Sequence, residues 1–381
     1  MPSSNITPST EPGFLRQAES AWLDGDFSSS TKALAAKAGS TPNFVLESAF
    51  DPGALPNGIT AEPLVLGGRS LSSHLVRIEQ GLAIFDIGVP LLHDGTFYSQ
   101  AFAHLKYPER YAHLFSEAAG QALAEAARSN HHVANAYVTL IRPPYYHWLL
   151  DTIPHLYGAS RLQHLDQVKL IAPDTMTFHP WQKALLEKAS GAFGIKNLAY
   201  LPTNGTAVAI RSSYSQTRMS LPERWSLLRL IAPSVSPKKP WRFLYSRRGT
   251  KDVRRLTNED ALIAALGEKF TVIDPSDLDL DTQMSLFAEA RCVVGVHGSN
   301  LANIAFCRAG TTVVEIAAGL SQPHFERLAE AADLEFVRVE ASPATLETHE
   351  KTWAQAHGDL TVNPADVIQA VDVGLATATS P

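Results

Sequence analysis

The sequence predicts an α/β protein with two Rossmann-like domains that face a cleft, and with a β-rich region appended on the N-terminal side. From residue 132 onward, short apolar runs of strand length alternate with segments of helical spacing, a pattern typical of a parallel sheet covered by helices. The run 292–296 is apolar and β-branched without alternation, as in a strand buried on both faces. The segment 233–240 holds three prolines and no apolar periodicity, so it predicts a linker between the two halves.

Length and composition agree with two globular domains. The chain has 381 residues, whereas a single domain commonly has about 100 to 200. Hydrophobic residues make up 45% and charged residues 18%, which is typical of a globular chain rather than a disordered one. The net charge of -6 argues against general electrostatic binding of nucleic acid. Two cysteines cannot form a disulfide framework, so we expect reduced thiols.

The N-terminal end carries no targeting or membrane signal. Residues 1–12 are polar and rich in proline and serine, which predicts a disordered tail. They have neither the basic nor the apolar region of a signal peptide. No stretch approaches the roughly 20 continuous apolar residues of a transmembrane helix. We therefore expect a cytoplasmic protein, with peripheral contact with the inner membrane left open.

The first domain is expected over residues 13–236. Spacing predicts helices over 14–37 and 121–128, and glycine-punctuated apolar segments between 61 and 98 predict short strands of an appended sheet. An αβ alternation follows and predicts one Rossmann-like layer. Its expected elements are strands over 132–141, 168–172, 197–201 and 207–214, and helices that begin at 145, 180 and 221.

The second domain is expected over residues 237–350. The segment 351–381 ends in a helix that we expect to pack back on the first domain. Strands are predicted over 241–246, 270–273, 292–296, 311–316 and 334–339, and helices over 258–270, 280–290, 325–332 and 364–376.

A cradle for phosphate is predicted after the strand 292–296. His297 lies between two glycines, which permit a sharp turn and a close approach of the backbone to a ligand. Ser299 or Asn300 can cap a short helix, whose first amides point toward an anion. Glu315 lies at the carboxyl end of the next strand, where we expect it to bind a ribose-type diol. The alternative is that His297 only satisfies a turn and that Glu315 only pairs with a surface arginine.

A second candidate site lies in the segment 145–157. His147 and Asp151 are four residues apart, so on a helix they share one face and the carboxylate can orient the imidazole. Either group can accept a proton from a hydroxyl near neutral pH, which suits a general base. Pro154 follows and is expected to kink the helix or mark its start. The alternative is an ordinary His–Asp pair on a helix surface.

A basic segment follows the strand 241–246. Guanidinium groups present forked donors that match diphosphate oxygens, so we expect a diphosphate clamp, against the alternative of a solvated basic loop. The cations are Arg247, Arg248, Lys251, Arg254 and Arg255.

These stretches together resemble glycosyltransferase family 61, the DUF563 group, over roughly residues 135–328. The resemblance depends on Tyr146-His-Trp-Leu-Leu-Asp151, on Tyr245-Ser-Arg-Arg248 with Arg255, Asn258 and Glu259, and on Gly295-Val-His-Gly-Ser-Asn-Leu-Ala-Asn-Ile-Ala-Phe306 with Gly310 and Glu315. Asn300 stands where the family usually has a small residue.

The resemblance implies a GT-B fold and an inverting, metal-independent transfer of a hexosyl or pentosyl group. The donor would be a nucleotide sugar, and the acceptor a glycan or lipid-linked saccharide hydroxyl in surface or capsular polysaccharide synthesis, with no cofactor. The residues expected to bind the donor are Arg247, Arg248, Arg255, His297, Gly298, Ser299, Asn300, Asn303 and Glu315. The expected base is Asp151, or His147 assisted by Asp151.

The nearest metal-binding pattern is Asp277-Leu-Asp-Leu-Asp281, which precedes a helix, so capping and solvation explain it better.

Two functions are alternatives to the glycosyltransferase. A sugar-nucleotide epimerase or dehydrogenase would need Gly-x-Gly-x-x-Gly in an early βα turn, and no suitable one is present. A non-catalytic nucleotide- or glycan-binding scaffold would not need His147, Asp151, His297 and Glu315 together.

Overall fold

The computed structural model of the chain describes residues 44–45, 52–53, 55, 58–79, 82–84, 89–91, 97–98, 132–137, 144–162, 168–173, 178–195, 198–203, 207–217, 219–233, 241–249, 254–275, 278–319, 323–344 and 358–377. The predicted tail over 1–12, the predicted helices over 14–37 and 121–128, most of the predicted linker and Lys251 lie outside these residues.

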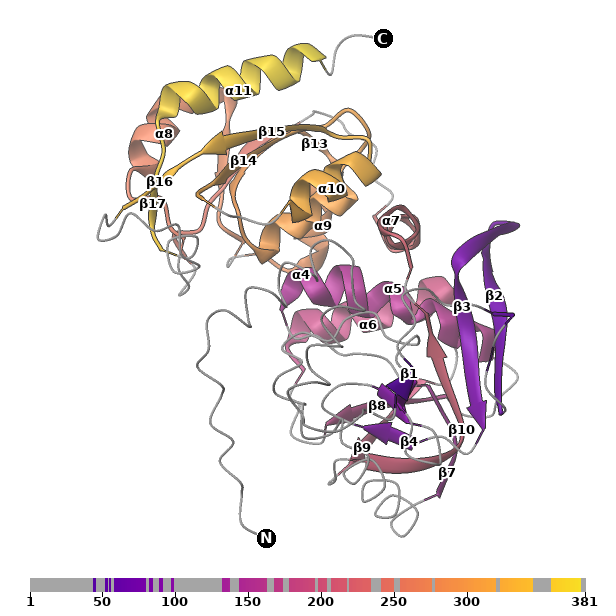
Figure 1. Ribbon diagram of the computed structural model, residues 1–381. Helices are drawn as coiled ribbons and strands as arrows, with labels where there is room; N and C mark the ends of the chain where they lie inside the picture. The colour runs from indigo at the N-terminus through magenta and orange to yellow at the C-terminus, as the bar shows by residue number, and fades with distance from the viewer. Residues whose placement is uncertain are drawn as a thin grey trace, which may run out of the picture. The chain divides into compact units, whose positions relative to one another are not determined.

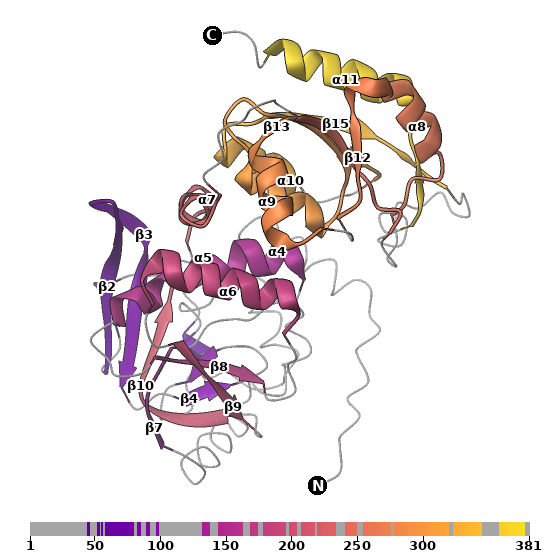
Figure 2. The same ribbon diagram turned by 180° about the vertical axis from the view of Figure 1, so that it is seen from behind.

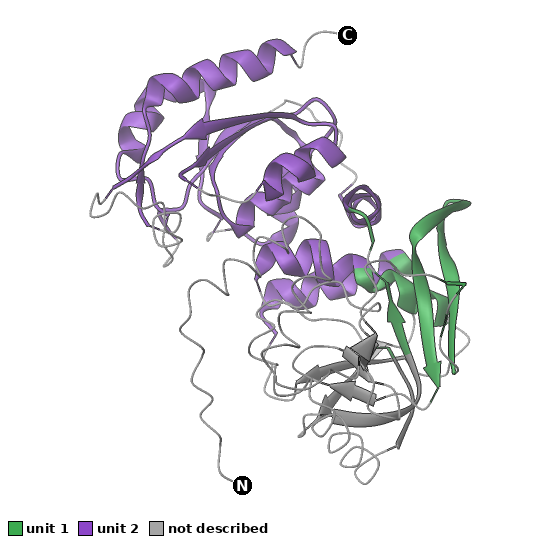
Figure 3. Cartoon of the chain, viewed as in Figure 1, with its two compact units in different colours: residues 1–141, 155–177, 193–220 green, residues 142–154, 178–192, 221–381 purple. Residues whose placement is uncertain are grey.

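The chain forms two compact units, each built from separate stretches of sequence (Figure 3). Unit 1 contains residues 1–141, 155–177 and 193–220, and unit 2 contains residues 142–154, 178–192 and 221–381. Compact units defined by contacts in the folded chain need not coincide with folding domains, so the domain limits predicted from the sequence stay predictions.

Unit 1 is organised around one large sheet (Figure 1). Its parallel part has the order β10-β7-β8-β9 and confirms the strands predicted in this region. The hairpin of β2 and β3 pairs with β10 through β3, so these strands belong to the same sheet and a separate appended sheet is not confirmed. The strands of unit 1 are β1 (Phe44–Val45), β2 (Ile59–Leu66), β3 (Arg69–Glu79), β4 (Leu82–Ile84), β5 (Val89–Leu91), β6 (Phe97–Tyr98), β7 (His132–Tyr137), β8 (Val168–Pro173), β9 (Leu198–Thr203) and β10 (Ala207–Gln216).

Hydrogen bonds that involve side chains hold the short 3-10 helix η4 (Tyr157–Leu162) against the sheet of unit 1. The phenol of Tyr157 donates to the carbonyl of Val65 over 2.6 Å, and the amide of Gly158 donates to Gln216 over 2.7 Å. These bonds tie η4 to both β2 and β10.

Unit 2 contains a five-stranded, fully parallel sheet in the order β12-β11-β13-β14-β15. Its strands are β11 (Trp241–Tyr245), β12 (Thr271–Ile273), β13 (Ala290–Val296), β14 (Thr312–Ala317) and β15 (Glu335–Glu340). Helical segments follow β11, β12, β13 and β14, as expected for a doubly wound sheet. The α/β class is therefore confirmed and the sheet is compatible with a Rossmann-like fold, whereas two such domains facing a cleft stay a prediction.

Helices cover both faces of this sheet (Figures 1 and 2). One face is covered by α8 (Glu259–Leu266) and α11 (Pro364–Thr377), and the other by α9 (Leu280–Ala288) and α10 (His324–Ala331). The core under α11 joins Val367 and Val371 to Val294 and Ile316 of the sheet. Each such aliphatic side chain contributes about 1.5 to 3 kcal/mol when it is fully buried.

The final helix differs from expectation. The sequence predicts that it returns to the first domain, but α11 packs on β14, β15 and α8 of unit 2. Its apolar side is buried there, and Gly374 lies so near Thr312 that an added Cβ would be 2.4 Å from Cγ2. The absence of a side chain at Gly374 thus allows the helix to approach β14 closely.

The remaining segments of unit 2 are α4 (Tyr145–His147), the π-helical turn η3 (Trp148–Thr152), α6 (Pro180–Phe193, whose last residue is in unit 1), α7 (Leu221–Arg229), η5 (Gly267–Lys269), the 3-10 helix η7 (Ser299–Phe306), β16 (Ser342–Pro343) and β17 (Leu360–Thr361). The helix α5 (Ile153–His155) has its last residue in unit 1. Cys292 and Cys307 are free thiols, and both are buried. In the described part of the chain, no helix is both long enough and apolar enough to cross a membrane.

Candidate active site

The strand order of unit 2 reverses between β11 and β13. The chain leaves β11 toward β12 on one side, and β13 then lies on the other side. In sheets of this kind, the carboxyl ends at the reversal form the crevice where ligands bind. Tyr245 of β11 pairs with Gly295 of β13, so the residues that follow, Arg247 and His297, emerge at the same edge.

The turn after β13 is held by the backbone. The amide of His297 donates to the carbonyl of Ile316 over 2.8 Å, and the amide of Leu301 donates to that of Gly298 over 2.8 Å. The predicted short helix is present as the 3-10 helix η7, with Gly298 at its N-cap and no side-chain capping bond. The predicted capping by Ser299 or Asn300 is therefore wrong, and both side chains are partly exposed.

Arg247 packs against this turn. A Cβ added at Gly298 would lie 2.2 Å from Nη1 of Arg247 and 3.1 Å from its Cζ. The backbone of Gly298 is extended, so glycine is needed here because of this close approach and not because of its dihedral angles. The result is a mostly buried cation beside the turn that was expected to bind phosphate.

A His–carboxylate pair supports the same turn. His297 Nδ1 lies 2.6 Å from Oε1 of Glu315 on the adjacent strand β14. Because a carboxylate oxygen accepts hydrogen bonds, Nδ1–H of His297 is the donor in this pair. The side chain of Glu315 is 2% exposed, so the carboxylate faces His297. The ribose contact expected of Glu315 stays a prediction.

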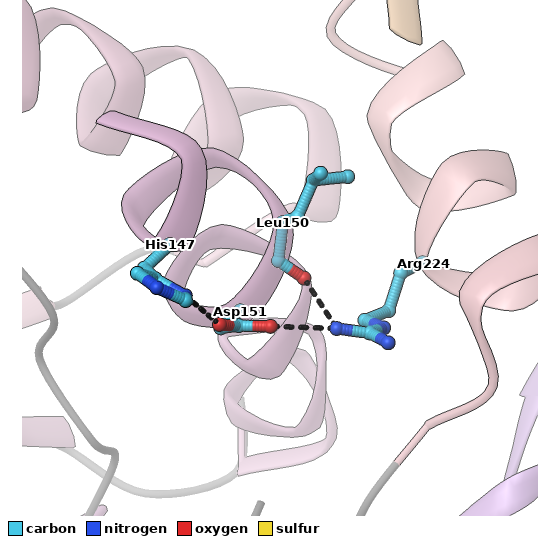
Figure 4. Close-up of polar contacts among 4 residues, drawn as sticks. All are labelled: His147, Leu150, Asp151 and Arg224. Carbon is cyan, nitrogen blue, oxygen red and sulfur yellow. Dashed lines mark hydrogen bonds and ion pairs between the residues drawn. The ribbon is translucent and has the colours of Figure 1, made fainter. Parts of the chain in front are cut away.

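A second pair joins His147 to Asp151, on the shared face that their spacing predicts (Figure 4). His147 Nδ1 lies 2.6 Å from Oδ2 of Asp151, whose side chain is 6% exposed. The turn between them is π-helical rather than α-helical. Local widening of this kind is common at functional sites.

Arg224 completes this arrangement, and the sequence analysis did not identify it. Pro154 has no N–H to donate to the carbonyl of Leu150, its acceptor in an α-helix. Nη1 of Arg224 donates to that carbonyl over 3.3 Å and to Oδ1 of Asp151 over 2.6 Å (Figure 4). Both carboxylate oxygens of Asp151 therefore accept hydrogen bonds, one from His147 and one from Arg224. The sequence indicates only that the carbonyl of Leu150 needs another donor, because Pro154 lies four residues after it.

The helix that carries Arg224 also holds the far end of η7. Nε1 of Trp225 donates to the carbonyl of Ala305 over 3.1 Å, and Nη1 of Arg229 donates to that of Phe306 over 2.9 Å. Helix α7 thus binds the His147–Asp151 segment through Arg224, and it binds the end of η7 through Trp225 and Arg229.

Asn303 lies inside a buried polar network. The phenol of Tyr145 donates to its Oδ1 over 2.5 Å, and its Nδ2 donates to Gln283 over 3.3 Å. Tyr245 donates to the same oxygen of Gln283 over 3.0 Å. Burial raises the pKa of both tyrosines, so both phenols stay protonated at neutral pH. Asn303 is fully buried, so it joins α4 to η7 and α9, and its expected donor contact stays a prediction.

Aromatic rings bring the two His–carboxylate pairs together. The ring centroid of Phe325 on α10 lies 5.1 Å from that of His297 and 5.7 Å from that of Tyr146. Tyr146 is adjacent to His147, with ring centroids 5.3 Å apart. On its other side, Tyr146 contacts His324 at 5.1 Å. Residues from α4, β13 and α10 thus converge within unit 2.

Arg248 and Arg255 of the basic segment are paired with acids. Arg248 forms ion pairs with Asp260 over 2.6 Å and with Glu259 over 3.3 Å, and the hydrogen bond to Asp260 raises its pKa. Arg255 pairs with Asp359 over 3.0 Å. Their side chains are 47% and 54% exposed. The structure therefore brings only Arg247 of the three expected arginines to the turn, and the donor contacts of Arg248 and Arg255 stay predictions.

The acidic pattern before α9 acts as expected of a cap. Oδ1 of Asp279 accepts from the amide of Thr282 over 2.7 Å, which lowers the pKa of this carboxyl. Asp281 pairs with Lys188 of α6 over 2.6 Å, and Asp277 lies outside the described residues. Among the residues that the structure describes, no three His, Cys, Asp or Glu side chains are grouped so as to hold a metal ion.

Two comparisons with known proteins bear on this site. The model of the family Glycosyltransferase 61 matches residues 145–314, which confirms the resemblance inferred from the motifs. The matched stretch contains His147, Asp151, Arg224 and His297, and it ends one residue before Glu315. A search of curated proteins finds no match to the chain.

Proposed function

We propose that the chain, which the Glycosyltransferase 61 family model matches over residues 145–314, moves a sugar from a nucleotide sugar to a glycan or lipid-linked saccharide hydroxyl, with inversion and without a metal ion. The observation that carries the proposal is the buried His147–Asp151–Arg224 arrangement. It lies in the same compact unit as the turn formed by His297 and Arg247.

His147 is the proposed general base. With its Nδ1–H donated to Asp151, the neutral imidazole presents an unprotonated Nε2 that can take the proton of the acceptor hydroxyl. The acceptor oxygen forms a bond to the anomeric carbon as the bond to the leaving phosphate oxygen breaks, and the phosphate keeps the electron pair. One such displacement inverts the anomeric carbon. Of the two expected bases, His147 is favoured because both oxygens of Asp151 already accept hydrogen bonds.

The leaving phosphate is assigned to the turn after β13. Negative charge develops on it, and preorganised cations and amides stabilise such charge strongly in a site that excludes water. Arg247 supplies the nearest guanidinium, and the partly exposed Ser299 and Asn300 flank it on the same turn. Glu315 is proposed to orient His297 through the 2.6 Å contact rather than to bind ribose.

The wider setting follows from the family. We propose a GT-B arrangement, a hexosyl or pentosyl donor, and a role in surface polysaccharide synthesis in the cytoplasm or at the inner membrane. These finer statements are supported by the motif resemblance and by the parallel, doubly wound sheet of unit 2.

The test combines a donor screen with paired histidine variants. Nucleotide release is measured with UDP-glucose, UDP-N-acetylglucosamine, UDP-xylose, GDP-mannose and dTDP-rhamnose, with methyl glycosides as acceptors and with or without EDTA. We expect EDTA-resistant turnover that falls about 10²- to 10⁴-fold in His147→Ala, with donor affinity unchanged by calorimetry. His179→Ala is the matched control, since His179 is an exposed histidine that stacks on Trp181 of α6. Turnover that requires a divalent ion would refute the metal-free step, and full activity in His147→Ala would refute the base.

A further inference from the structure

A third histidine lies where the two His–carboxylate pairs meet. His324 and Phe325 form the first turn of α10. Phe325 is buried and contacts the rings of both His297 and Tyr146. The ring of His324 lies against Tyr146, tilted by 37° at a centroid distance of 5.1 Å. The first turn of α10 is therefore next to both pairs.

Titratable groups from several elements face His324. His147 and Asp151 face it from α4 and η3, His297 from the end of β13, and Arg327 from the next turn of α10. Burial first, and then His147, His297 and Arg327, lower the pKa of His324 to about 4, while Asp151 acts in the opposite direction. His324 is thus a neutral imidazole near pH 7, with one N–H donor and one acceptor nitrogen.

We propose that His324 is a third substrate-contacting residue, which binds a hydroxyl group of the transferred sugar through its neutral ring. The inference rests on the proposed function. In a single displacement, the sugar lies between the incoming oxygen and the leaving phosphate. His147 is assigned to the first and the turn at His297 to the second, so a group beside both faces the sugar.

The neutral state suits this position chemically. Positive charge builds on the sugar ring in transition states of glycosyl transfer, which resemble an oxocarbenium ion. A cation next to the ring would oppose that charge, whereas a neutral imidazole can hold a hydroxyl as donor or acceptor without this cost. His147 and His297 differ from His324 because each of them is paired with a carboxylate.

Two variants separate hydrogen bonding from packing. His324→Phe keeps a ring against Tyr146 and removes both polar atoms, whereas His324→Asn supplies one donor and one acceptor. With the nucleotide sugars named above, we expect kcat/KM to fall about tenfold in His324→Phe, the loss of one typical hydrogen bond, and to recover partly in His324→Asn. The pH profile of kcat/KM should keep its shape, because His324 does not titrate in the working range.

Calorimetry with UDP, GDP and dTDP locates the contact on the sugar. Free nucleotides should bind His324→Phe as they bind the unchanged protein, and thermal melting should show that the variant is folded. Wild-type turnover in His324→Phe would overturn the inference and leave the proposed function intact, and so would an equal loss of free-nucleotide affinity. Absence of turnover by the unchanged protein with every donor would overturn the proposed function, and this inference with it.

Discussion

Replacement of Arg224 by leucine should lower the free energy of unfolding more than the same replacement of Arg229, the other arginine of α7. Arg224 and Asp151 form a buried ion pair of 2.6 Å, with side chains that are 10% and 6% exposed. Leucine keeps most of the bulk of the side chain but leaves the carboxylate with one strong partner fewer. The carbonyl of Leu150 also loses its contact with the guanidinium.

The magnitude follows from what is left behind. Removal of one partner of a buried ion pair costs about 3 to 5 kcal/mol because a charge stays without compensation. His147 still bonds to Oδ2 of Asp151, so we expect the lower end, about 3 kcal/mol. Arg229→Leu is the matched control on the same helix. Its guanidinium bonds to the neutral carbonyl of Phe306, and its loss should cost about 1 kcal/mol.

The assay is urea unfolding followed by tryptophan fluorescence, in a double-mutant cycle with Asp151→Asn. In the Asp151→Asn background no carboxylate is left without its partner, and the guanidinium that Arg224→Leu removes is itself an uncompensated buried charge, so this change should cost at most about 1 kcal/mol. Equal costs for Arg224→Leu and Arg229→Leu, or a cost unchanged by Asp151→Asn, would refute the reasoning.

Three further predictions concern close contacts and pH. In Gly298→Ala, the new Cβ would displace the guanidinium of Arg247, 2.2 Å away, so affinity for free nucleotide should fall about tenfold with stability nearly unchanged; calorimetry that shows unchanged affinity would count against this. In Gly374→Ala, the new Cβ would meet Cγ2 of Thr312 at 2.4 Å, and unfolding free energy should fall by about 1 to 3 kcal/mol. Thr312→Ser should relieve part of this loss, whereas a more stable Gly374→Ala variant would show that the helix can shift. His324 has its pKa lowered from 6.5 to about 4, so the folded state binds fewer protons than the unfolded state between these values. The free energy of unfolding should therefore fall as pH drops from 6.5 to 4, and the fall should be about 1 to 3 kcal/mol larger in the unchanged protein than in His324→Phe. Urea titrations that give both proteins the same dependence on pH would contradict this.

The parts of the site that could be predicted from the sequence depend on short-range geometry. His147 and Asp151 lie one helical turn apart, so their contact follows from helix geometry even though the turn is π-helical. The position of His297 follows from a buried strand that ends in glycines. The parallel order of the strands in unit 2 also follows from the alternation of strand and helix patterns.

The parts that were missed depend on residues far apart in the chain. Arg224 lies 73 residues from Asp151, and no local pattern marks the arginine that turns inward. The ion pairs of Arg248 with Asp260 and of Arg255 with Asp359 were not predictable either, and the diphosphate clamp expected of the basic segment stays a prediction. Such pairing is set by which carboxylates the fold brings near, and charge density along the sequence does not reveal it.

Unit 2 gathers residues 142–154, 178–192 and 221–381, and this has a consequence for how the protein is made. The ribosome synthesises Asp151 146 residues before His297, a delay of roughly 7 to 30 s at ordinary elongation rates. During that interval the segment 145–152, whose Trp148, Leu149 and Leu150 are fully buried in the finished protein, lacks its contacts with α7 and η7. A chain cut at the predicted linker near residue 236 would separate α4, η3 and α7 from η7 and the sheet of unit 2. Both fragments would then expose apolar surface, so expression of either half alone should favour aggregation.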